Sequence, residues 1–201
     1  TVVGAATAAQ LNAIDALLGP NATLSVSEIT DVAANVAAVD ALIGGVGVGS
    51  NADVTIIGAI SAANANALME TTGVVTATVT AGTAAALNAA LGDVSGDNLT
   101  LTVLDLAPVL TVIPATAAAD LLALISGGVV NATAVTAISG TAAQITALLA
   151  EVAGNGLTLG AAVDFTVTDQ VSISDLVLID AATTGDITAA SVKGSVVELT
   201  G

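Results

Sequence analysis

The residues best suited to chemistry in this sequence are oxygen ligands in a short loop that contains glycine. The segment GDVSGDN brings Asp93, Asp97 and Asn98 close together. Carboxylate and amide oxygens on a flexible loop are the ligands that calcium requires. The segment therefore predicts a calcium site at these three residues. The loop follows neither the EF-hand pattern nor the glycine- and aspartate-rich nonapeptide repeat of calcium-binding β-helices.

The acidic residues also have a second interpretation, as helix caps and solvated surface groups. Asp105 and Asp175 each precede an apolar run, and a carboxylate is favourable at the start of a helix. Asp164 and Asp169 bracket an expected strand and could serve either purpose. The sequence leaves both interpretations open, with calcium as the one cofactor that it suggests.

Side chains for nucleophilic or acid–base catalysis are almost missing from the chain. It contains no His and no Cys, and Lys193 is its only basic residue. A Ser or Thr nucleophile would lack its usual base. Two carboxylates could hydrolyse a glycoside, but such sites usually hold sugar rings with aromatic side chains, and Phe165 is the only aromatic residue. The sequence predicts no catalytic residue and no enzymatic activity.

The charge of the chain limits its partners. Seventeen acidic residues stand against one lysine, which gives a net charge of -16. Nucleic-acid binding needs clustered Lys and Arg to neutralise phosphates, so the sequence predicts no nucleic-acid partner. Repulsion among the carboxylates should be strongest at low salt. The absence of cysteine excludes disulfides and thiolate metal sites.

A threonine-led phrase recurs along the chain and predicts short helices. Thr7, Thr83 and Thr141 each open a Thr-Ala-Ala sequence that is followed by apolar residues and then by glycine. Threonine can accept a hydrogen bond from the free amides of the first helical turn, and glycine commonly ends a helix. The sequence thus assigns Thr7, Thr83 and Thr141 as helix caps, for helices within Thr7–Gly19, Thr83–Gly92 and Thr141–Gly154, with a weaker copy at Ser61–Gly73.

Alternating segments between these phrases predict strands. Val75, Ala77 and Val79 alternate with threonine, and the same period of two occurs in Leu99–Val103 and Val163–Asp169. A second set of helices is expected within Ile29–Gly45, Asp105–Gly128 and Ser174–Gly185. Similar strand phrases start at Gly73, Gly128 and Gly185, which are 55 and 57 residues apart.

This order of elements predicts an α/β fold with a parallel β-sheet. Helices that connect successive strands enforce parallel pairing through crossovers, which are nearly always right-handed. A core of small aliphatic residues without aromatics favours stacked repeats over a compact globule. We therefore expect a right-handed solenoid that forms one elongated domain over residues 1–201, as part of a longer array or filament.

Two further possibilities follow from local patterns. Leu121–Ala150 is a long uncharged run, but Gly127, Gly128 and Gly140 interrupt it and no basic or aromatic anchors flank it, so we expect no membrane span. The alternating threonines at positions 76, 78 and 80 are similar to the threonine rows of ice-binding solenoids. That activity needs a flat array over several neighbouring strands, whereas threonine is also common on ordinary exposed strands.

Three stretches carry a resemblance to a known class of proteins: GTAAALNAALG, SGTAAQITALLAEVAG and DLVLIDAATTGDITAASVKGSVVELTG. They resemble the Ala/Thr-rich repeat arrays of large, acidic, exported or cell-surface proteins of cyanobacteria and other bacteria. Those arrays are similar to type I secreted proteins and are often found near calcium-binding repeats. The resemblance implies an extracellular, repetitive and non-enzymatic role, and it carries over no catalytic residue.

The expected function is that of an extracellular or cell-surface structural protein. The chain would be a subunit or segment of a filament, sheath, surface layer or adhesin stalk that assembles with copies of itself by end-to-end stacking. The alternative is a calcium-dependent adhesive or carbohydrate-binding module.

Overall fold

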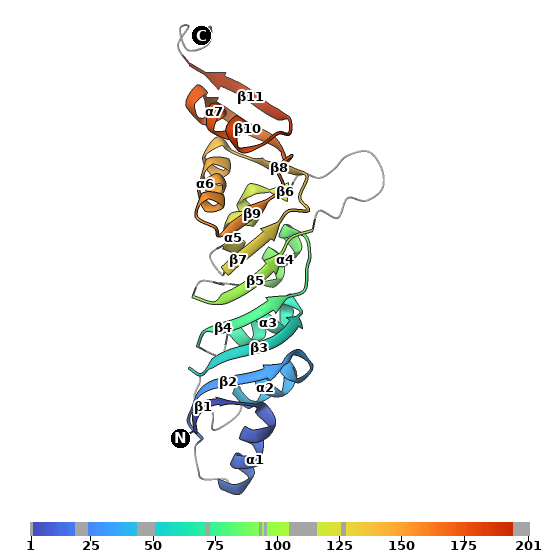
Figure 1. The fold of residues 1–201 in the computed structure, drawn as a ribbon, viewed down its shortest axis with the longest axis vertical. Coiled ribbons are helices and arrows are strands. Elements are labelled where there is room, and N and C mark those ends of the chain that lie inside the picture. Colours follow the sequence, from blue (N-terminus) through green and yellow to red (C-terminus); the bar gives the residue numbers. More distant parts are fainter. Residues whose placement is uncertain are drawn as a thin grey trace. The chain divides into compact units, whose positions relative to one another are not determined.

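The chain folds as alternating helices and parallel strands (Figure 1). The computed structural model describes residues 2–18, 24–43, 51–70, 73–92, 94, 96–104, 116–125 and 128–194. These residues contain seven α-helices and one short 3-10 helix, and none of the sheets that they form closes into a barrel. The predicted α/β class with parallel sheets is confirmed.

The chain divides into two compact units. The first comprises Thr1–Thr80 and Ala90–Leu101, and the second comprises Ala81–Ala89 and Thr102–Gly201. In the first unit, and in the C-terminal part of the second, helices connect strands that pair with each other. We call a strand together with the helix that follows it a strand–helix repeat.

The first unit is a run of parallel strands that pair in chain order, β1-β2-β3-β4-β5. Helices connect β1 to β2, β2 to β3 and β3 to β4, so each of these pairs is a crossover of the kind that parallel sheets require. Its elements are β1 (Val2–Ala6), α1 (Ala8–Leu18), β2 (Val26–Val32), the 3-10 helix η1 (Ala33–Asn35), α2 (Val36–Ile43), β3 (Asp53–Ile60), α3 (Ala62–Met69), β4 (Val75–Val79) and β5 (Asn98–Thr102).

The second unit has two sets of parallel strands. Strands β6, β8, β10 and β11 pair in that order, and β7 pairs with β9. Its elements are α4 (Ala84–Ala90), β6 (Thr116–Ala117), α5 (Ala118–Ile125), β7 (Gly128–Ala132), β8 (Ala137–Gly140), α6 (Ala142–Ala153), β9 (Leu157–Leu159), β10 (Asp164–Ser172), α7 (Ile173–Ala182) and β11 (Ile187–Lys193).

The threonine-led phrases and the alternating segments form the elements that the sequence predicts. Helices α1, α3, α4 and α6 each start one residue after the Thr or Ser of a phrase. In β4 the residues Val75, Ala77 and Val79 are buried while Thr76 and Thr78 are exposed. Both agreements rest on short-range periodicity, which tertiary packing has not overridden.

One helix prediction is wrong in its first part. The segment from Ile29 was expected to be helical, but Val26–Val32 is strand β2, and the α-helix begins only at Val36. In β2 the apolar residues Val26 and Ile29 are buried, and β-branched residues suit this pleated position. Of the helix expected within Asp105–Gly128, residues 118–125 form α5, and residues 105–115 lie outside the described ranges.

The core of each unit consists of small aliphatic side chains. Leucine, isoleucine, valine and alanine supply the buried positions, and Phe165 on β10, at 1% exposed, is the largest fully buried side chain. Helices contribute one narrow face each: α6, for example, buries Ala142, Ile145 and Leu148 against the strands. Thin layers of this kind allow neighbouring repeats to pack closely.

In the described part of the chain, no helix combines the length and the apolar character that a membrane crossing requires.

Candidate functional site

The predicted calcium loop is only partly within the described residues. Asp93 lies outside them, whereas Asp97 and Asn98 lie where β5 starts. Oδ1 of Asp97 accepts a hydrogen bond of 2.8 Å from the backbone N–H of Val75, the first residue of the adjacent strand β4. Asn98 is exposed on the outer face of β5. Among the described residues, no three or more acidic side chains form a group that could hold a metal ion.

The bond made by Asp97 belongs to a set that recurs in both units. Five aspartates accept a backbone N–H that lies 21 to 27 residues away in the sequence, in a neighbouring strand–helix repeat. We call these the inter-repeat carboxylate bonds. They run from Ala8 to Asp31 (2.9 Å), from Val74 to Asp53 (2.9 Å), from Val75 to Asp97 (2.8 Å), from Asp186 to Asp164 (2.8 Å) and from Ala142 to Asp169 (2.7 Å).

Two of these aspartates cap the helix of the preceding repeat. Asp31 accepts from Ala8, the first residue of α1, and Asp169 accepts from Ala142, the first residue of α6. The first amides of a helix have no partner within the helix, and a carboxylate there also interacts favourably with the helix dipole. Each of these bonds therefore ties a helix start to the next strand.

The parallel register explains why both caps reach their helices. Ala6, the last residue of β1, pairs with Ile29, and Gly140, the last residue of β8, pairs with Val167. Each aspartate lies two residues beyond the paired residue, and each helix begins two residues beyond its strand. The same offset thus produces the same cap in both units.

Asp31 is the most enclosed of these groups. It is 4% exposed, and Oδ1 also accepts from the backbone N–H of Val32 and from the side-chain amide of Asn35, each at 2.8 Å. Burial alone would raise the pKa of Asp31, but the hydrogen bonds from Asn35, Ala8 and Val32 outweigh it and lower the pKa. The ionised carboxylate is therefore the form that the fold stabilises.

Two glycines make room for carboxylates of this set. A Cβ atom on Gly73 would lie 2.6 Å from Oδ1 of Asp53, and one on Gly185 would lie 2.6 Å from Oδ1 of Asp164. Real Cβ atoms essentially never approach so closely, so any larger residue would displace the carboxylate from the N–H of Val74 or Asp186. The glycines that open two of the repeated strand phrases thus have a packing role.

The three assigned cap threonines lie at helix starts. Oγ1 of Thr7 accepts from the N–H of Gln10 at 3.3 Å, and Oγ1 of Thr83 accepts from the N–H of Ala86 at 3.1 Å. At Thr141 the bond from the N–H of Gln144 is 3.2 Å, and the Gln144 side chain returns a bond to the Thr141 N–H. This reciprocal pair is a capping box, which satisfies two amides at once.

A row of polar residues crosses the outer face of the first unit. Thr30, Thr55, Thr76 and Asn98 are in register on four neighbouring strands. The sequence did not reveal this row, because its members are 21 to 25 residues apart. Glu28 and Asp53 form the adjacent row on the side where the strands begin. The row on the other side holds only Thr78 and Thr100, on β4 and β5. These short threonine rows are narrower than the flat array expected for ice binding, and we do not propose that activity.

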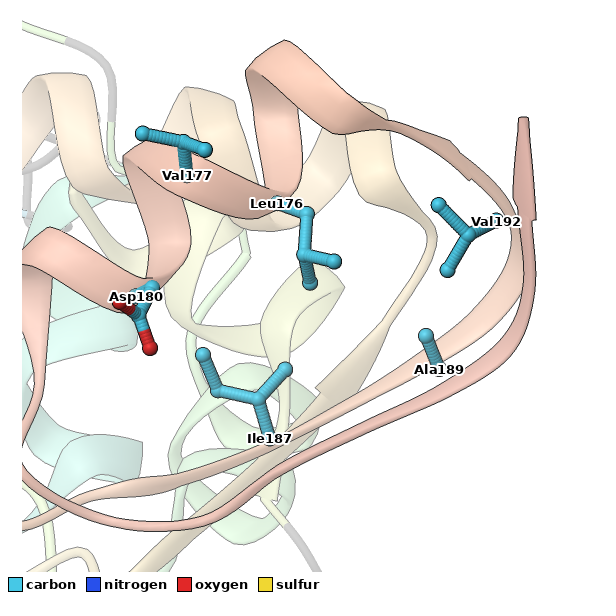
Figure 2. Close-up of a pocket in the computed structure, with 6 residues that line it drawn as sticks. All are labelled: Leu176, Val177, Asp180, Ile187, Ala189 and Val192. Carbon is cyan, nitrogen blue, oxygen red and sulfur yellow. The ribbon is translucent and has the colours of Figure 1, made fainter. Parts of the chain in front are cut away.

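Two grooves lined mostly by apolar residues lie beside α7. One, of about 420 Å3, lies between α6 and α7. The other, of about 500 Å3, lies between α7 and β11 and is lined by Leu176, Val177, Asp180, Ile187, Ala189 and Val192. Figure 2 shows Leu176, Ile187 and Ala189 projecting into the space between these two elements. Asp180 is the single charged residue of this lining, which we call the α7–β11 groove.

Sequence reasoning missed the two inter-repeat aspartates of the first half, Asp31 and Asp53. A usable signal was present in the spacing: Asp53 precedes Gly73 by 20 residues, and Asp164 precedes Gly185 by 21. A recurrent Asp-to-Gly spacing of about one strand–helix repeat is what a carboxylate bond between adjacent strands would produce. The pairing itself became visible only with the register.

Comparison with known proteins adds no assignment: no family model, curated protein or solved structure matches the chain.

Proposed function

We propose that this chain is a structural element of an extracellular or cell-surface assembly, built as a right-handed solenoid over residues 1–201. Its role is mechanical: regular repeats bury small apolar side chains and satisfy backbone groups between neighbours, so stability accumulates along the stack. Such a segment serves a filament, sheath, surface layer or adhesin stalk.

The observation that supports the proposal is the hydrogen bonding of the aspartates. Five carboxylates, which are the residues best suited to bind a cation, are hydrogen-bonded to backbone amides of adjacent repeats. A carboxylate that accepts such a bond holds two repeats together without any bound ligand. These five carboxylates therefore join neighbouring repeats.

The resemblance of the Thr-Ala-Ala phrases to bacterial repeat arrays supports the same role and adds the extracellular setting. A net charge of -16 would keep such a repetitive, aliphatic chain soluble before it assembles. We do not propose an enzymatic activity or a nucleic-acid partner.

The competing proposal is a calcium-dependent adhesive module. It would require the side-chain oxygens of Asp93, Asp97 and Asn98 to coordinate one calcium ion. One Asp97 oxygen already accepts the Val75 amide, which favours a structural role for this carboxylate. A carboxylate can still bind an ion through its second oxygen, so calcium titration of the purified chain decides between the two proposals.

The setting is tested by antibody labelling of intact cells that produce the protein. The proposal expects gold label on the outer surface of cells that have not been permeabilised. Label that appears only after permeabilisation would refute an extracellular role. An antibody against a cytoplasmic protein, which must label only permeabilised cells, is the control.

A further inference from the structure

The turn that follows α6 contains the only Asn-Gly pair of the chain. Asn155 is exposed there, and Gly156 directly precedes strand β9. The other nine of the ten asparagines are followed by Ala, Val or Leu. An asparagine that precedes glycine is the most reactive of these, because glycine has no Cβ to hinder attack by its own backbone nitrogen. The turn is therefore the place where the chain is most open to modification of an asparagine.

The reaction is spontaneous deamidation, and its only co-reactant is water. The backbone nitrogen of Gly156 attacks Cγ of Asn155, and the new bond replaces the bond from Cγ to Nδ2. The amide proton of Gly156 leaves with Nδ2 as ammonia, and a five-membered succinimide ring remains. Water then opens the ring. Breaking the new bond gives aspartate, whereas breaking the original peptide bond gives isoaspartate, in which the backbone runs through Cγ.

The fold holds Asn155 in a conformation that cannot close this ring. Among the described residues, Asn155 is the one non-glycine residue with a positive φ, 67°. In the left-handed helical region Cβ lies roughly opposite the nitrogen of the next residue, whereas a five-membered ring requires these two atoms to be nearly eclipsed. Asn155 must therefore leave this conformation before Gly156 can attack.

Two hydrogen bonds at the end of α6 maintain the conformation. The N–H of Asn155 donates to the carbonyl oxygen of Val152 at 3.3 Å, and the N–H of Gly156 donates to that of Glu151 at 3.0 Å. This pair of bonds is the Schellman motif, in which a left-handed residue closes the last helical turn. The second bond also holds the proton that the attacking nitrogen must lose. The reaction thus requires the last turn of α6 to open.

Gly156 also joins neighbouring repeats, so a change of the backbone beside it has consequences. Its carbonyl oxygen accepts a hydrogen bond of 3.0 Å from the N–H of Val130, where β7 pairs with β9. A Cβ atom on Gly156 would lie 3.1 Å from Oε2 of Glu151 and 3.3 Å from Cγ2 of Ile125, so the glycine has no room to move toward either side chain. Isoaspartate adds a methylene group to the backbone and a negative charge at the C-terminal end of α6, where the helix dipole disfavours it.

We propose that Asn155 is a site of spontaneous deamidation that the last turn of α6 keeps slow, and that isoaspartate at this position weakens the pairing of β9 with β7. The rate of the reaction then measures how often the helix end opens. The inference goes beyond the proposed structural role and does not depend on it, since water is the only reactant that the chain does not supply.

The test incubates the full-length chain with and without urea at constant pH and temperature. Peptic peptides are analysed by mass spectrometry, in which deamidation adds one dalton, and labelling by an isoaspartate methyltransferase identifies the isoaspartate product. We expect Asn155 to react at least about tenfold faster in urea than in the folded chain, and faster in urea than the other nine asparagines. The control is Asn155→Gly, which removes the reacting group and suits a positive φ.

Two matched variants test the role of the helix end. Ala150 lies in the last turn of α6 and Ala143 in the first, and both are exposed. Glycine weakens a helix at the position where it is placed. In the folded chain we expect Ala150→Gly to accelerate the reaction about three- to fivefold and Ala143→Gly less than about twofold. Circular dichroism of both must match that of the wild type. If either fails this check, Ala150→Ser and Ala143→Ser replace the pair and must rank in the same order.

Hydrogen exchange tests the consequence for the sheet. The N–H of Val130 should exchange at least about threefold faster in chains that carry isoaspartate than in fresh chains. The N–H of Phe165, which donates to the carbonyl oxygen of Asp186 in another strand pair, should stay unchanged. Four outcomes would overturn the inference: no reaction at Asn155 in urea, equal rates with and without urea, equal acceleration by the two alanine variants, or unchanged exchange at Val130.

Discussion

Replacing Asp31 with asparagine should destabilise the first compact unit more than any other change to a single acidic group. The asparagine keeps the size of the side chain but replaces one carboxylate oxygen with an NH2 group. That group would face the N–H of Ala8, which now lies 2.9 Å from Oδ2 of Asp31. Two donors would then meet at a position that is 4% exposed, where water cannot readily replace the lost acceptor.

The size of the effect follows from the bonds that change. Hydrogen bonds to charged groups contribute about 1.5–3 kcal/mol, and a buried donor left unpaired costs about 1–3 kcal/mol. One such bond is lost, while Val32 and Asn35 still find an oxygen acceptor in the asparagine. We therefore expect Asp31→Asn to lower the free energy of unfolding by about 2 kcal/mol at pH 7.

The same substitution has a defined pH dependence. Hydrogen bonds lower the pKa of Asp31 in the folded state, whereas the unfolded value is about 3.9. The carboxylate therefore stabilises the fold fully above about pH 4, and this contribution is lost as the pH falls through the folded-state pKa. The difference between wild type and Asp31→Asn should accordingly shrink below about pH 4.

Urea unfolding followed by far-ultraviolet circular dichroism, between pH 2.5 and 7, measures this difference. Asp15→Asn is the control, because it makes the same change in net charge at an exposed position of α1. Hydrogen exchange of the Ala8 amide reports the bond directly and should accelerate in Asp31→Asn. Equal stability at pH 7, or a difference that stays constant down to pH 2.5, would refute the role assigned to the ionised carboxylate.

Four further predictions use the same unfolding assay. Asp169→Asn should lower the free energy of unfolding by about 0.5–1 kcal/mol, less than Asp31→Asn, because Asp169 is exposed and water can replace its hydrogen bond to Ala142. A larger loss than that of Asp31→Asn would contradict this ranking. Thr141→Ala should cost about 1 kcal/mol while Thr141→Ser restores the cap, and equal losses in both would exclude capping as the cause. Phe165→Ala should cost about 3–5 kcal/mol and Phe165→Leu less than about 1.5 kcal/mol, whereas similar losses would show that ring volume is unimportant. Calcium should stabilise the chain no more than magnesium does. An occupied calcium site at 100 times its Kd would instead raise the free energy of unfolding by about 2.7 kcal/mol, and that result would contradict the prediction.

The elements that the sequence predicted correctly depend on short-range patterns. Thr141 and Gln144 lie three residues apart and form their capping box within one helical turn, so local spacing is sufficient to identify the helix start. The alternation in β4 is likewise visible over five residues. Both patterns are contained in the local sequence and do not depend on residues elsewhere in the chain.

The strand β2 shows where local patterns fail. The segment that begins at Ile29 contains alanines and spaced apolar residues, which suit a helix, but Ile29 pairs with both Ala6 and Val54 and is fully buried between them. Pairing on both edges outweighs a weak helical preference. The sequence of the segment does not indicate which two strands it pairs with.

The inter-repeat carboxylate bonds could not be predicted for a related reason. Asp97 was grouped with Asp93 and Asn98 because they are adjacent in the sequence, whereas its observed partner is the amide of Val75, 22 residues away. Which amide a carboxylate meets depends on strand register, and a shift of one residue would turn the side chain to the other face. The chemical type of Asp97 was evident from the sequence, but its partner was not.

Electron microscopy of the purified wild-type chain, with and without EDTA, tests the central claim most directly. The account holds that repeats join through their own backbone, side chains and strand edges, without a bound ion. It predicts fibres at moderate salt that survive EDTA unchanged. Particles that remain single under all conditions, or fibres that dissolve in EDTA and return with calcium, would contradict it.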